Sequence, residues 1–244
     1  MTFQFAHFGT GSRAVVIGAG GGLGAAFVRA IVEADAFKTV YALSRSGRDI
    51  SGAQAIAASV TDPDSLTAAA DTIRADGPID LALIATGVLH GDALQPEKTY
   101  RALEWDAMRR VFEINTFGPA LAAKAFLPLL AKDRRAVLAA LSARVGSISD
   151  NGLGGWHSYR ASKAALNMML RNFAIEMSRR APQAIILGLH PGTVDTDLSK
   201  PFQSGVKTLF TPDISAAHLL SVIDAAKPAD SGKLFAWDGA EIGF

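Results

Sequence analysis

The chain has 244 residues, of which 49% are apolar and 19% charged, and 24 Lys and Arg stand against 23 Asp and Glu. This composition can bury a large core and excludes a disordered chain, and the net charge of +1 argues against a surface that binds polyanions. Because cysteine is absent, disulfides, thiolate nucleophiles and cysteine-ligated zinc are excluded.

Short β-rich runs alternate with longer helical patterns along the chain. The short apolar runs predict strands over residues 13–18, 39–43, 79–85, 136–141, 184–189 and 233–237. Apolar residues at helical spacing predict helices over 22–34, 100–130, 157–180 and 213–226, and the pair Asp62-Pro63 predicts a further helix start. We expect Pro128 to end or bend the helix that contains it.

The alternation of strands and helices indicates βαβ units. Right-handed crossovers then give a parallel sheet that is covered by helices on both faces. We therefore expect one doubly wound α/β domain over residues 1–244, with ligands bound beyond the carboxyl ends of the strands.

A glycine-rich loop joins the first predicted strand to the first helix, with the sequence Gly18-Ala19-Gly20-Gly21-Gly22-Leu23-Gly24. Glycines allow a pyrophosphate to approach the backbone, and the N-terminus of the following helix attracts an anion. The loop therefore predicts dinucleotide binding, and a glycine-rich turn without a ligand is the alternative. A P-loop is excluded because no Gly-Lys-Ser/Thr follows.

The end of the second predicted strand favours one type of dinucleotide. An acidic residue there would bind a ribose 2′-hydroxyl, whereas an arginine accommodates a 2′-phosphate. Here the strand ends in Ser44 and Arg45, with no carboxylate before Asp49. We therefore expect NADP, with NAD less favoured. The alternative is that Arg45 is a solvated surface charge.

Tyr159 and Lys163 lie four residues apart and therefore on one face of a predicted helix. A nearby ammonium favours the phenolate, so we expect Lys163 to lower the pKa of Tyr159 from its ordinary value near 10. A tuned tyrosine can exchange a proton with a carbonyl or alcohol oxygen while hydride moves at carbon. A pair on the helix surface is the alternative for this spacing taken alone.

Three further polar residues are candidates for the same chemistry. Asn115 has poor helix propensity, and we expect it either to hold a helix distortion and a water in a proton relay or to be a satisfied buried amide. Ser142 and Ser147 follow the fourth predicted strand, where a hydroxyl could donate to a substrate carbonyl.

Together, these motifs resemble those of the short-chain dehydrogenase/reductase superfamily, over essentially the whole chain. The glycine loop is similar to that family's cofactor loop, Asn115 to its catalytic asparagine, and the Tyr159–Lys163 pair to its catalytic pair. The resemblance implies a Rossmann fold, a segment from Pro191 that contacts the nicotinamide end, and a Lys163 that also holds the nicotinamide ribose. The positions expected to bind the cofactor are Gly18, Gly22, Leu23, Gly24, Ser44, Arg45, Val60, Ala85, Gly87, Lys163, Pro191, Gly192, Thr193 and Thr196. The run 144–148 and the ending 235–239 resemble the C-factor and Sniffer-like carbonyl reductase branch.

The sequence departs from the family pattern in four places. The usual Asn-Asn-Ala-Gly is replaced by residues 84–87, Ile-Ala-Thr-Gly, the acidic residue near adenine by Ser59, and the threonine that opens the glycine loop by Ile17. The usual position of the catalytic serine is Ala143. We therefore expect Ser147, with Ser142 as second choice, to orient the carbonyl.

We expect an NADP-dependent oxidoreductase that reduces a ketone or aldehyde, or oxidises the alcohol. Tyr159 is its general acid, and residues 197–211 form a loop that covers an apolar substrate. The alternatives are a signalling or regulatory protein of C-factor type that binds the cofactor with little turnover, and a flavoprotein. No histidine pair at metal-binding spacing and no Gly-x-Ser-x-Gly is present, so a zinc site and a hydrolase elbow are not expected.

We also expect the protein to be soluble and cytoplasmic, without a nucleic-acid or membrane partner. Its apolar runs are far shorter than the ~20 residues of a membrane helix, and residues 1–12 show no signal-peptide pattern. A homo-oligomer paired through the predicted helices 100–130 and 157–180 is one possibility that the pattern leaves open.

Overall fold

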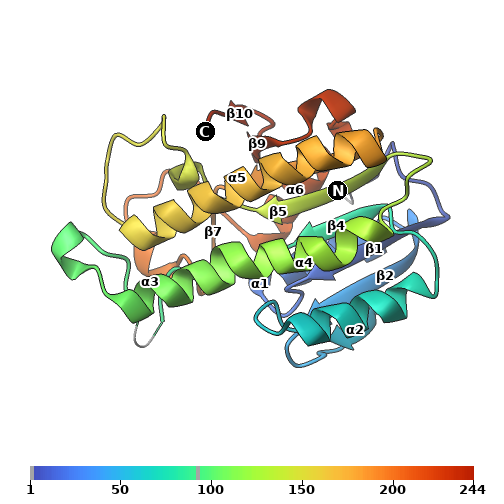
Figure 1. The fold of residues 1–244 in the computed structure, drawn as a ribbon, viewed down its shortest axis with the longest axis horizontal. Coiled ribbons are helices and arrows are strands. Elements are labelled where there is room, and N and C mark those ends of the chain that lie inside the picture. The colour runs from blue at the N-terminus through green and yellow to red at the C-terminus, as the bar shows by residue number, and fades with distance from the viewer. Residues whose placement is uncertain (1–2, 92–93) are drawn as a thin grey trace.

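The computed structural model describes residues 3–91 and 94–244, so the first two residues of the N-terminal segment lie outside the described residues. Its main sheet has the strand order β10-β9-β6-β5-β4-β1-β2-β3, with helices on both faces (Figure 1). The strands of this sheet are β1 (Ser12–Ile17), β2 (Phe37–Ser44), β3 (Gln54–Ala57), β4 (Leu81–Ile84), β5 (Ala136–Leu141), β6 (Ala184–His190), β9 (Lys233–Ala236) and β10 (Glu241–Ile242). The predicted doubly wound α/β fold is confirmed.

Neighbouring strands from β3 to β9 are all parallel, but β10 pairs antiparallel with β9. The expected parallel sheet is therefore found in every neighbouring pair from β3 to β9, and the pair β9–β10 departs from it. A tight turn that contains Gly239, with φ +82°, connects these last two strands, and the N–H of Ala236 donates to the carbonyl of Ala240 at 2.8 Å. Such a short connection can join only antiparallel strands.

The sheet separates two apolar cores. Val15 and Ile17 of β1 pack into the core beneath α2 (Pro63–Arg74), α4 (Gly118–Phe126) and α5 (His157–Arg180). Ala14 and Val16 pack into the opposite core, beneath α1 (Gly22–Glu33) and α6 (Pro212–Ala225). Strand β1 is thus buried on both faces, as its unbroken apolar run indicated.

The chain order reverses between β1 and β4. After β1 the chain adds β2 and β3 on one side, and β4, β5, β6 and β9 follow on the other. In a doubly wound sheet, ligands bind beyond the carboxyl ends of the strands at this reversal. Loops that follow β1, β4, β5 and β6 therefore contain the candidate site.

Most predicted elements match the structure within two residues. The predicted strands correspond to β1, β2, β4, β5, β6 and β9, and the helix over 157–180 has the bounds of α5. The helix start at Asp62 is confirmed, because its carboxylate accepts from the N–H groups of Asp64 and Ser65, at 3.2 Å each. No strand was expected at β3, at β10 or at the small pair β7 (Thr193–Val194) and β8 (Leu209–Phe210).

The single helix predicted over 100–130 is wrong. The stretch contains a 3-10 turn (Tyr100–Ala102), α3 (Trp105–Phe112), a π-helical turn (Glu113–Phe117), α4 and a second 3-10 turn (Leu127–Leu129). Leu103 has extended backbone, with ψ 122°, which separates the first turn from α3. Pro128 lies in the last 3-10 turn and ends the helical run, as expected.

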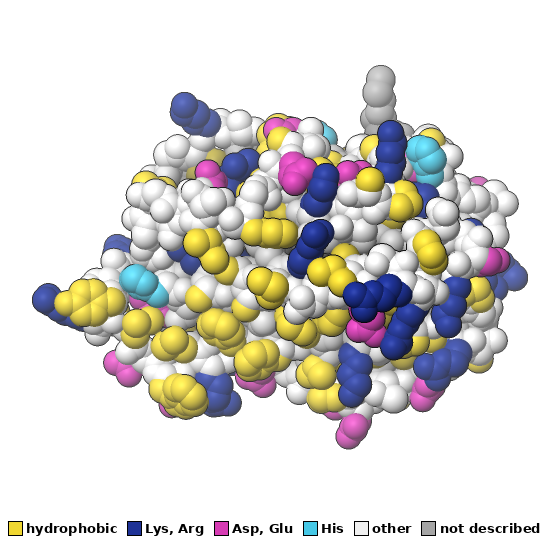
Figure 2. Space-filling model, turned by 45° about the horizontal axis from the view of Figure 1, so that its top comes forward, with side chains coloured by type: hydrophobic (Ala, Val, Ile, Leu, Met, Phe, Trp, Pro, Cys, Tyr) yellow, Lys and Arg dark blue, Asp and Glu magenta, His cyan; other side chains and the backbone are white. Residues whose placement is uncertain are grey.

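Apolar side chains are exposed on α3, the π-helical turn and α5, where they include Trp105, Phe117 and Met168. Figure 2 shows apolar side chains gathered on the left of one face and Lys and Arg side chains on its right. Among the helices in the described ranges, none combines the length and apolar character needed to span a bilayer.

Candidate functional site

The glycine loop folds tightly between β1 and α1. The N–H groups of Gly18 and Ala19 both donate to the carbonyl of Leu43, at 2.9 Å. Gly18 has φ +95°, and a Cβ on Gly24 would lie 2.1 Å from the Gly18 carbonyl oxygen. Both positions therefore require glycine. The first turn of α1 has no side-chain cap, so its N–H groups remain available to an anion.

Ser44 and Arg45 lie at the end of β2, beside this loop. Ser44 is buried, and its hydroxyl accepts from the N–H of Arg48 at 3.1 Å. Arg45 is exposed. Of the two residues expected at a 2′-phosphate, Arg45 is therefore the one whose side chain extends from the surface.

The loops after β4 and β6 lie next to the glycine loop. A Cβ on Gly18 would lie 2.9 Å from Cγ2 of Thr86 and 3.0 Å from the Ala85 carbonyl. A Cβ on Gly22 would lie 2.9 Å from Cγ2 of Thr196, so the segment from Pro191 stands beside the start of α1. The structure therefore gathers the glycine loop and segments 85–87 and 191–196 at one end of the sheet. Val60 is half-buried and lies against Gly118, at the start of α4.

Tyr159 and Lys163 are both buried in the first turns of α5. Lys163 Nζ donates to the carbonyl of Leu141 at 2.9 Å and lies 5.8 Å from the centre of the Tyr159 ring. A Cβ on Gly87 would lie 3.6 Å from Lys163 Nζ, so the loop after β4 meets this pair. The sequence spacing thus leads to a buried pair at the end of β5, and not to a surface pair.

The expected lowering of the Tyr159 pKa is not what the structure shows. Burial raises the pKa of Tyr159 to about 12 and lowers the pKa of Lys163 to about 8. Removal of water disfavours the charged form of each group, and the ammonium bonds to the Leu141 carbonyl and not to the phenol. In this state Tyr159 is a neutral phenol at pH 7.

Asn115 lies in the π-helical turn and is fully buried. Its Oδ1 accepts from the N–H of Val88, and its Nδ2 donates to the Val88 carbonyl, both at 2.8 Å; Nδ2 also lies 3.2 Å from Ser162 Oγ. The helix is distorted here and the amide is satisfied, and the water relay stays a prediction. The bonds hold the loop after β4 against α5.

Neither candidate serine bonds to Tyr159 within the described residues. Ser142 donates to Oδ1 of Asn167 at 2.6 Å, and Ser147 accepts from the N–H of Asp150 at 3.1 Å. Ala143, in contrast, packs against Tyr159. Both candidate serines therefore bond to other partners. Alternation of side chains after β5 accounts for Ser142, since its neighbour Ala143 is the residue that packs against Tyr159, whereas Ser147 lies beyond the 3-10 turn Arg144–Gly146.

A cluster of apolar and aromatic side chains surrounds Tyr159, and the sequence analysis did not predict most of it. We call it the Tyr159 cluster; besides Tyr159 it contains Leu89, Ala143, Val145, Trp156 and Phe202. The Trp156 and Phe202 rings are edge to face at 5.1 Å, and His90 lies 5.6 Å from Phe202. Phe202 belongs to the predicted covering loop 197–211, so this loop does reach the site. No periodic pattern marked Trp156, which precedes the helix.

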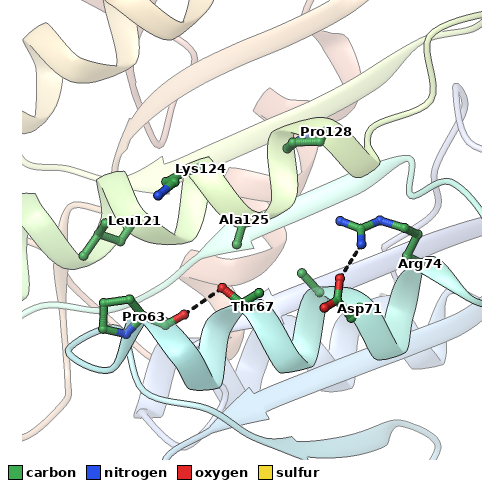
Figure 3. A pocket seen from close by; sticks show the side chains of 9 residues that line it. Pro63, Thr67, Asp71, Arg74, Leu121, Lys124, Ala125 and Pro128 are labelled. Atoms are coloured by element: carbon green, nitrogen blue, oxygen red, sulfur yellow. Dashed lines mark hydrogen bonds and ion pairs between the residues drawn. The ribbon is translucent and has the colours of Figure 1, made fainter.

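A separate hollow lies between α2 and α4 (Figure 3). Its Arg74 pairs with Asp71 of the same helix, and Thr67 donates to the Pro63 carbonyl at 3.0 Å. The residues that line it include none of the predicted site residues: they are Pro63, Thr67, Ala70, Asp71, Arg74, Leu121, Lys124, Ala125 and Pro128. The hollow is therefore distinct from the candidate site.

Comparison with known proteins places this chain among oxidoreductases. The family described as short chain dehydrogenase matches residues 12–207. The chain is 38% identical over 181 residues to 1-hydroxy-2-glutathionyl-2-methyl-3-butene dehydrogenase of Rhodococcus sp. (strain AD45), covering 74% of this chain and 75% of that protein. It is 37% identical over 140 residues to C-signal of Myxococcus xanthus, covering 57% and 80%.

Among solved structures, the fold is similar to that of an NADPH-bound carbonyl reductase from chicken fatty liver. The TM-score is 0.82 at 27% sequence identity, over 95% of this chain and 98% of that one. Together with the similarity to C-signal, this match agrees with the branch expected from the sequence.

Proposed function

The chain belongs to the short-chain dehydrogenase family of oxidoreductases, and from this premise we propose that it reduces ketones or aldehydes with NADPH, with the reverse oxidation of an alcohol also available. The observation that carries the proposal is the burial of Tyr159 and Lys163 beside Gly87, in the loop that meets the glycine loop. This arrangement puts one proton donor next to the expected place of a dinucleotide.

The residues of the glycine loop fit a dinucleotide. The positive φ of Gly18 and the close approach at Gly24 leave the backbone bare where a pyrophosphate would lie, at the uncapped start of α1. Arg45 would meet a 2′-phosphate, which is why we propose NADP over NAD. The NADPH bound to the chicken carbonyl reductase supports this choice. A bound NADPH would supply the hydride.

Tyr159 would act as general acid. With a pKa of about 12, its phenol holds its proton at pH 7 and can give it to the carbonyl oxygen as negative charge develops there. Lys163, held by the Leu141 carbonyl, would present its ammonium to the phenol and to a ribose hydroxyl. Asn115 would keep the Gly87–Val88 loop in place through its two bonds to Val88.

The Tyr159 cluster favours an apolar carbonyl substrate. Its walls are apolar and aromatic, and residue 143 supplies a methyl group where the family pattern has a hydroxyl. The phenol of Tyr159 is therefore the one hydroxyl of this cluster, within the described residues, that can donate to the substrate oxygen. Substrates with carbonyls that are already electrophilic depend least on a second donor.

The test is NADPH oxidation against a panel of aliphatic and aromatic aldehydes and ketones. We expect turnover by the wild-type protein and a loss of about 10³-fold or more in Tyr159→Phe. Tyr100→Phe is the matched control, because Tyr100 is 66% exposed and is not a member of the cluster. Equal turnover by Tyr159→Phe and the wild type would contradict the proposal.

A signalling or regulatory protein is the second candidate function. The 37% identity to C-signal supports it. Binding of NADPH without turnover on any member of the panel would favour this function, whereas the presence of Tyr159, Lys163 and Asn115 favours the enzyme. A cytoplasmic location and a homo-oligomeric state stay predictions, to be measured by cell fractionation and by light scattering.

A further inference from the structure

Glu97 is a buried carboxylate that the proposed reaction does not use. It is 5% exposed, and it lies in the segment that leads from Leu94 toward α3. Among the ion pairs of residues 3–91 and 94–244, none includes Glu97. A buried carboxylate without a cation is expensive unless hydrogen bonds replace its water.

Among the described residues, the hydrogen bonds of Glu97 go to the start of α5. Its carboxylate accepts from the N–H of Ser158 at 3.1 Å and from the Ser158 hydroxyl, and its backbone carbonyl accepts from the N–H of Trp156. One residue, distant in sequence, thus bonds on both sides of position 157. We call this set of three bonds the Glu97 clamp.

The start of α5 is strained and lacks a cap of its own. The N-cap residue, Trp156, has left-handed backbone at φ 48° and ψ 43° and makes no side-chain capping bond. Gly154 and Gly155 before it are also left-handed, at φ +66° and +65°. Strain of this kind costs about 1–3 kcal/mol at a non-glycine residue and persists only where its surroundings hold it. Glu97 supplies the missing cap and holds the strained residue.

The residues that the clamp holds adjoin Tyr159 directly. Ser158 precedes it, and the Trp156 ring packs edge to face on Tyr159 at 6.2 Å and on Phe202 at 5.1 Å. The other end of this turn is fixed separately, because Lys163 is bonded to β5 through Leu141. Release of the clamp would therefore let the phenol move relative to the lysine while the rest of α5 stays packed.

We propose that Glu97 is a positioning residue for Tyr159, which fixes the phenol by holding Trp156 and Ser158 through the Glu97 clamp. The proposal rests on the proposed reductase function. Glu97 touches neither substrate nor cofactor in this role. Its loss therefore changes the rate of the chemical step and not the affinity for NADPH.

The test compares Glu97→Ala and Glu97→Gln with Glu104→Ala and Tyr159→Phe. Glu104 is the matched control, since it is an exposed acid at the start of α3 that makes no capping bond. We expect Glu97→Ala to lower kcat about 10²-fold, the scale of a 1 Å misplacement, with the dissociation constant for NADPH unchanged. Glu97→Gln retains an acceptor for the Ser158 N–H, so it restores most of the lost kcat. Glu104→Ala behaves as the wild type.

A second readout separates positioning from stability. Hydrogen exchange of residues 156–160 accelerates in Glu97→Ala at temperatures where the melting curve shows a folded protein. If Glu97→Ala does not fold, Ser158→Ala is measured instead, because it removes one bond of the clamp. We expect its kcat to fall. The double variant Ser158→Ala/Glu97→Gln should show no further loss of kcat.

The outcomes distinguish this proposal from the one on which it rests. A folded Glu97→Ala with wild-type kcat and exchange, beside an inactive Tyr159→Phe, overturns the clamp and leaves the reductase in place. The Glu97 clamp is also overturned if the loss of kcat in Glu97→Ala is proportional to the fraction of that variant that is unfolded. An active Tyr159→Phe overturns both.

Discussion

On the β1–α1 side of the site the surface is made by glycine backbone, whereas on the α5 side it is made by buried side chains from distant parts of the chain. Gly18 and Gly24 belong to one short loop, and their geometry follows from local sequence. The surroundings of Tyr159 join segments around residues 89, 97, 143, 156 and 202. The difference teaches that the proposed cofactor side depends on the absence of side chains, whereas the proposed catalytic side depends on polar groups whose burial lowers the free energy of unfolding.

The largest effect is expected on the catalytic side, at Lys163. We expect Lys163→Met to lower kcat about 10³-fold, because the proposed site loses the ammonium that would hold the nicotinamide ribose beside Tyr159. The same change should raise the free energy of unfolding at pH 7 by about 2 kcal/mol, since burial lowers the Lys163 pKa from 10.5 to about 8 and the lost bond to Leu141 offsets only part of that penalty.

The pH dependence of the free energy of unfolding provides the control for the Lys163→Met prediction. A folded-state pKa below the unfolded one means that the unfolded chain binds more protons between about pH 8 and 10.5, so this group makes the wild type more stable as pH rises through that window. The stability difference between Lys163→Met and wild type, measured by urea unfolding, should shrink from pH 7 to pH 10. If Lys163→Met is less stable than the wild type at both pH 7 and pH 10, burial of the Lys163 ammonium does not destabilise the wild type.

A side chain added at a crowded position of the glycine loop should weaken the binding of NADPH. A Cβ on Gly24 meets the Gly18 carbonyl at 2.1 Å, whereas one on Gly21 lies at an ordinary 3.5 Å from the same atom. Overpacking of this kind costs about 1–3 kcal/mol, or roughly 10- to 10²-fold in affinity. We expect that loss in NADPH binding by Gly24→Ala, measured by fluorescence titration, and almost none for Gly21→Ala. Equal losses would show that the close contact does not shape the loop.

Arg45 tests the choice of cofactor. Loss of a hydrogen bond to a charged group costs about 1.5–3 kcal/mol, so Arg45→Ala should weaken NADPH binding about tenfold or more. The affinity for NADH should stay as in the wild type, because NADH lacks the 2′-phosphate. An equal loss of affinity for NADPH and NADH would show that Arg45 does not contact the 2′-phosphate.

The smallest effect is expected from the addition of a hydroxyl group at position 143. Ala143→Ser adds a hydroxyl beside Tyr159, and we expect kcat/KM for an unactivated ketone to rise about fivefold, well below the 10²-fold worth of an evolved donor. Ser147→Ala is the comparison, because Ser147 bonds to Asp150 and should matter little. A 10²-fold loss of kcat/KM in Ser147→Ala would instead support Ser147 as the serine that orients the carbonyl, as first expected from the sequence.

The contrast between the two sides also explains what the sequence could predict. The glycine loop, the α5 helix and the Tyr159–Lys163 spacing are local patterns, and the structure reproduces them. The raised pKa of Tyr159 was not predictable from a spacing of four residues, because it depends on burial by segments that are distant in sequence.

Long-range partners were missed for the same reason. Glu97 lies in an aperiodic segment, and only the fold brings it to Ser158. The stretch 100–130 is broken at Leu103, whose extended backbone no helical period records. The edge strands β3, with four residues, and β10, with two residues, are too short to show a pattern of their own.

The account depends most on proton donation by Tyr159, and a single-turnover measurement tests this most directly. NADPH bound to excess protein is mixed with a saturating ketone, and the decay of its absorbance at about 340 nm is followed in the wild type and in Tyr159→Phe. We predict a fast decay in the wild type and one about 10³-fold slower in the variant, with equal NADPH affinity. Equal decay rates in the two proteins would contradict the account.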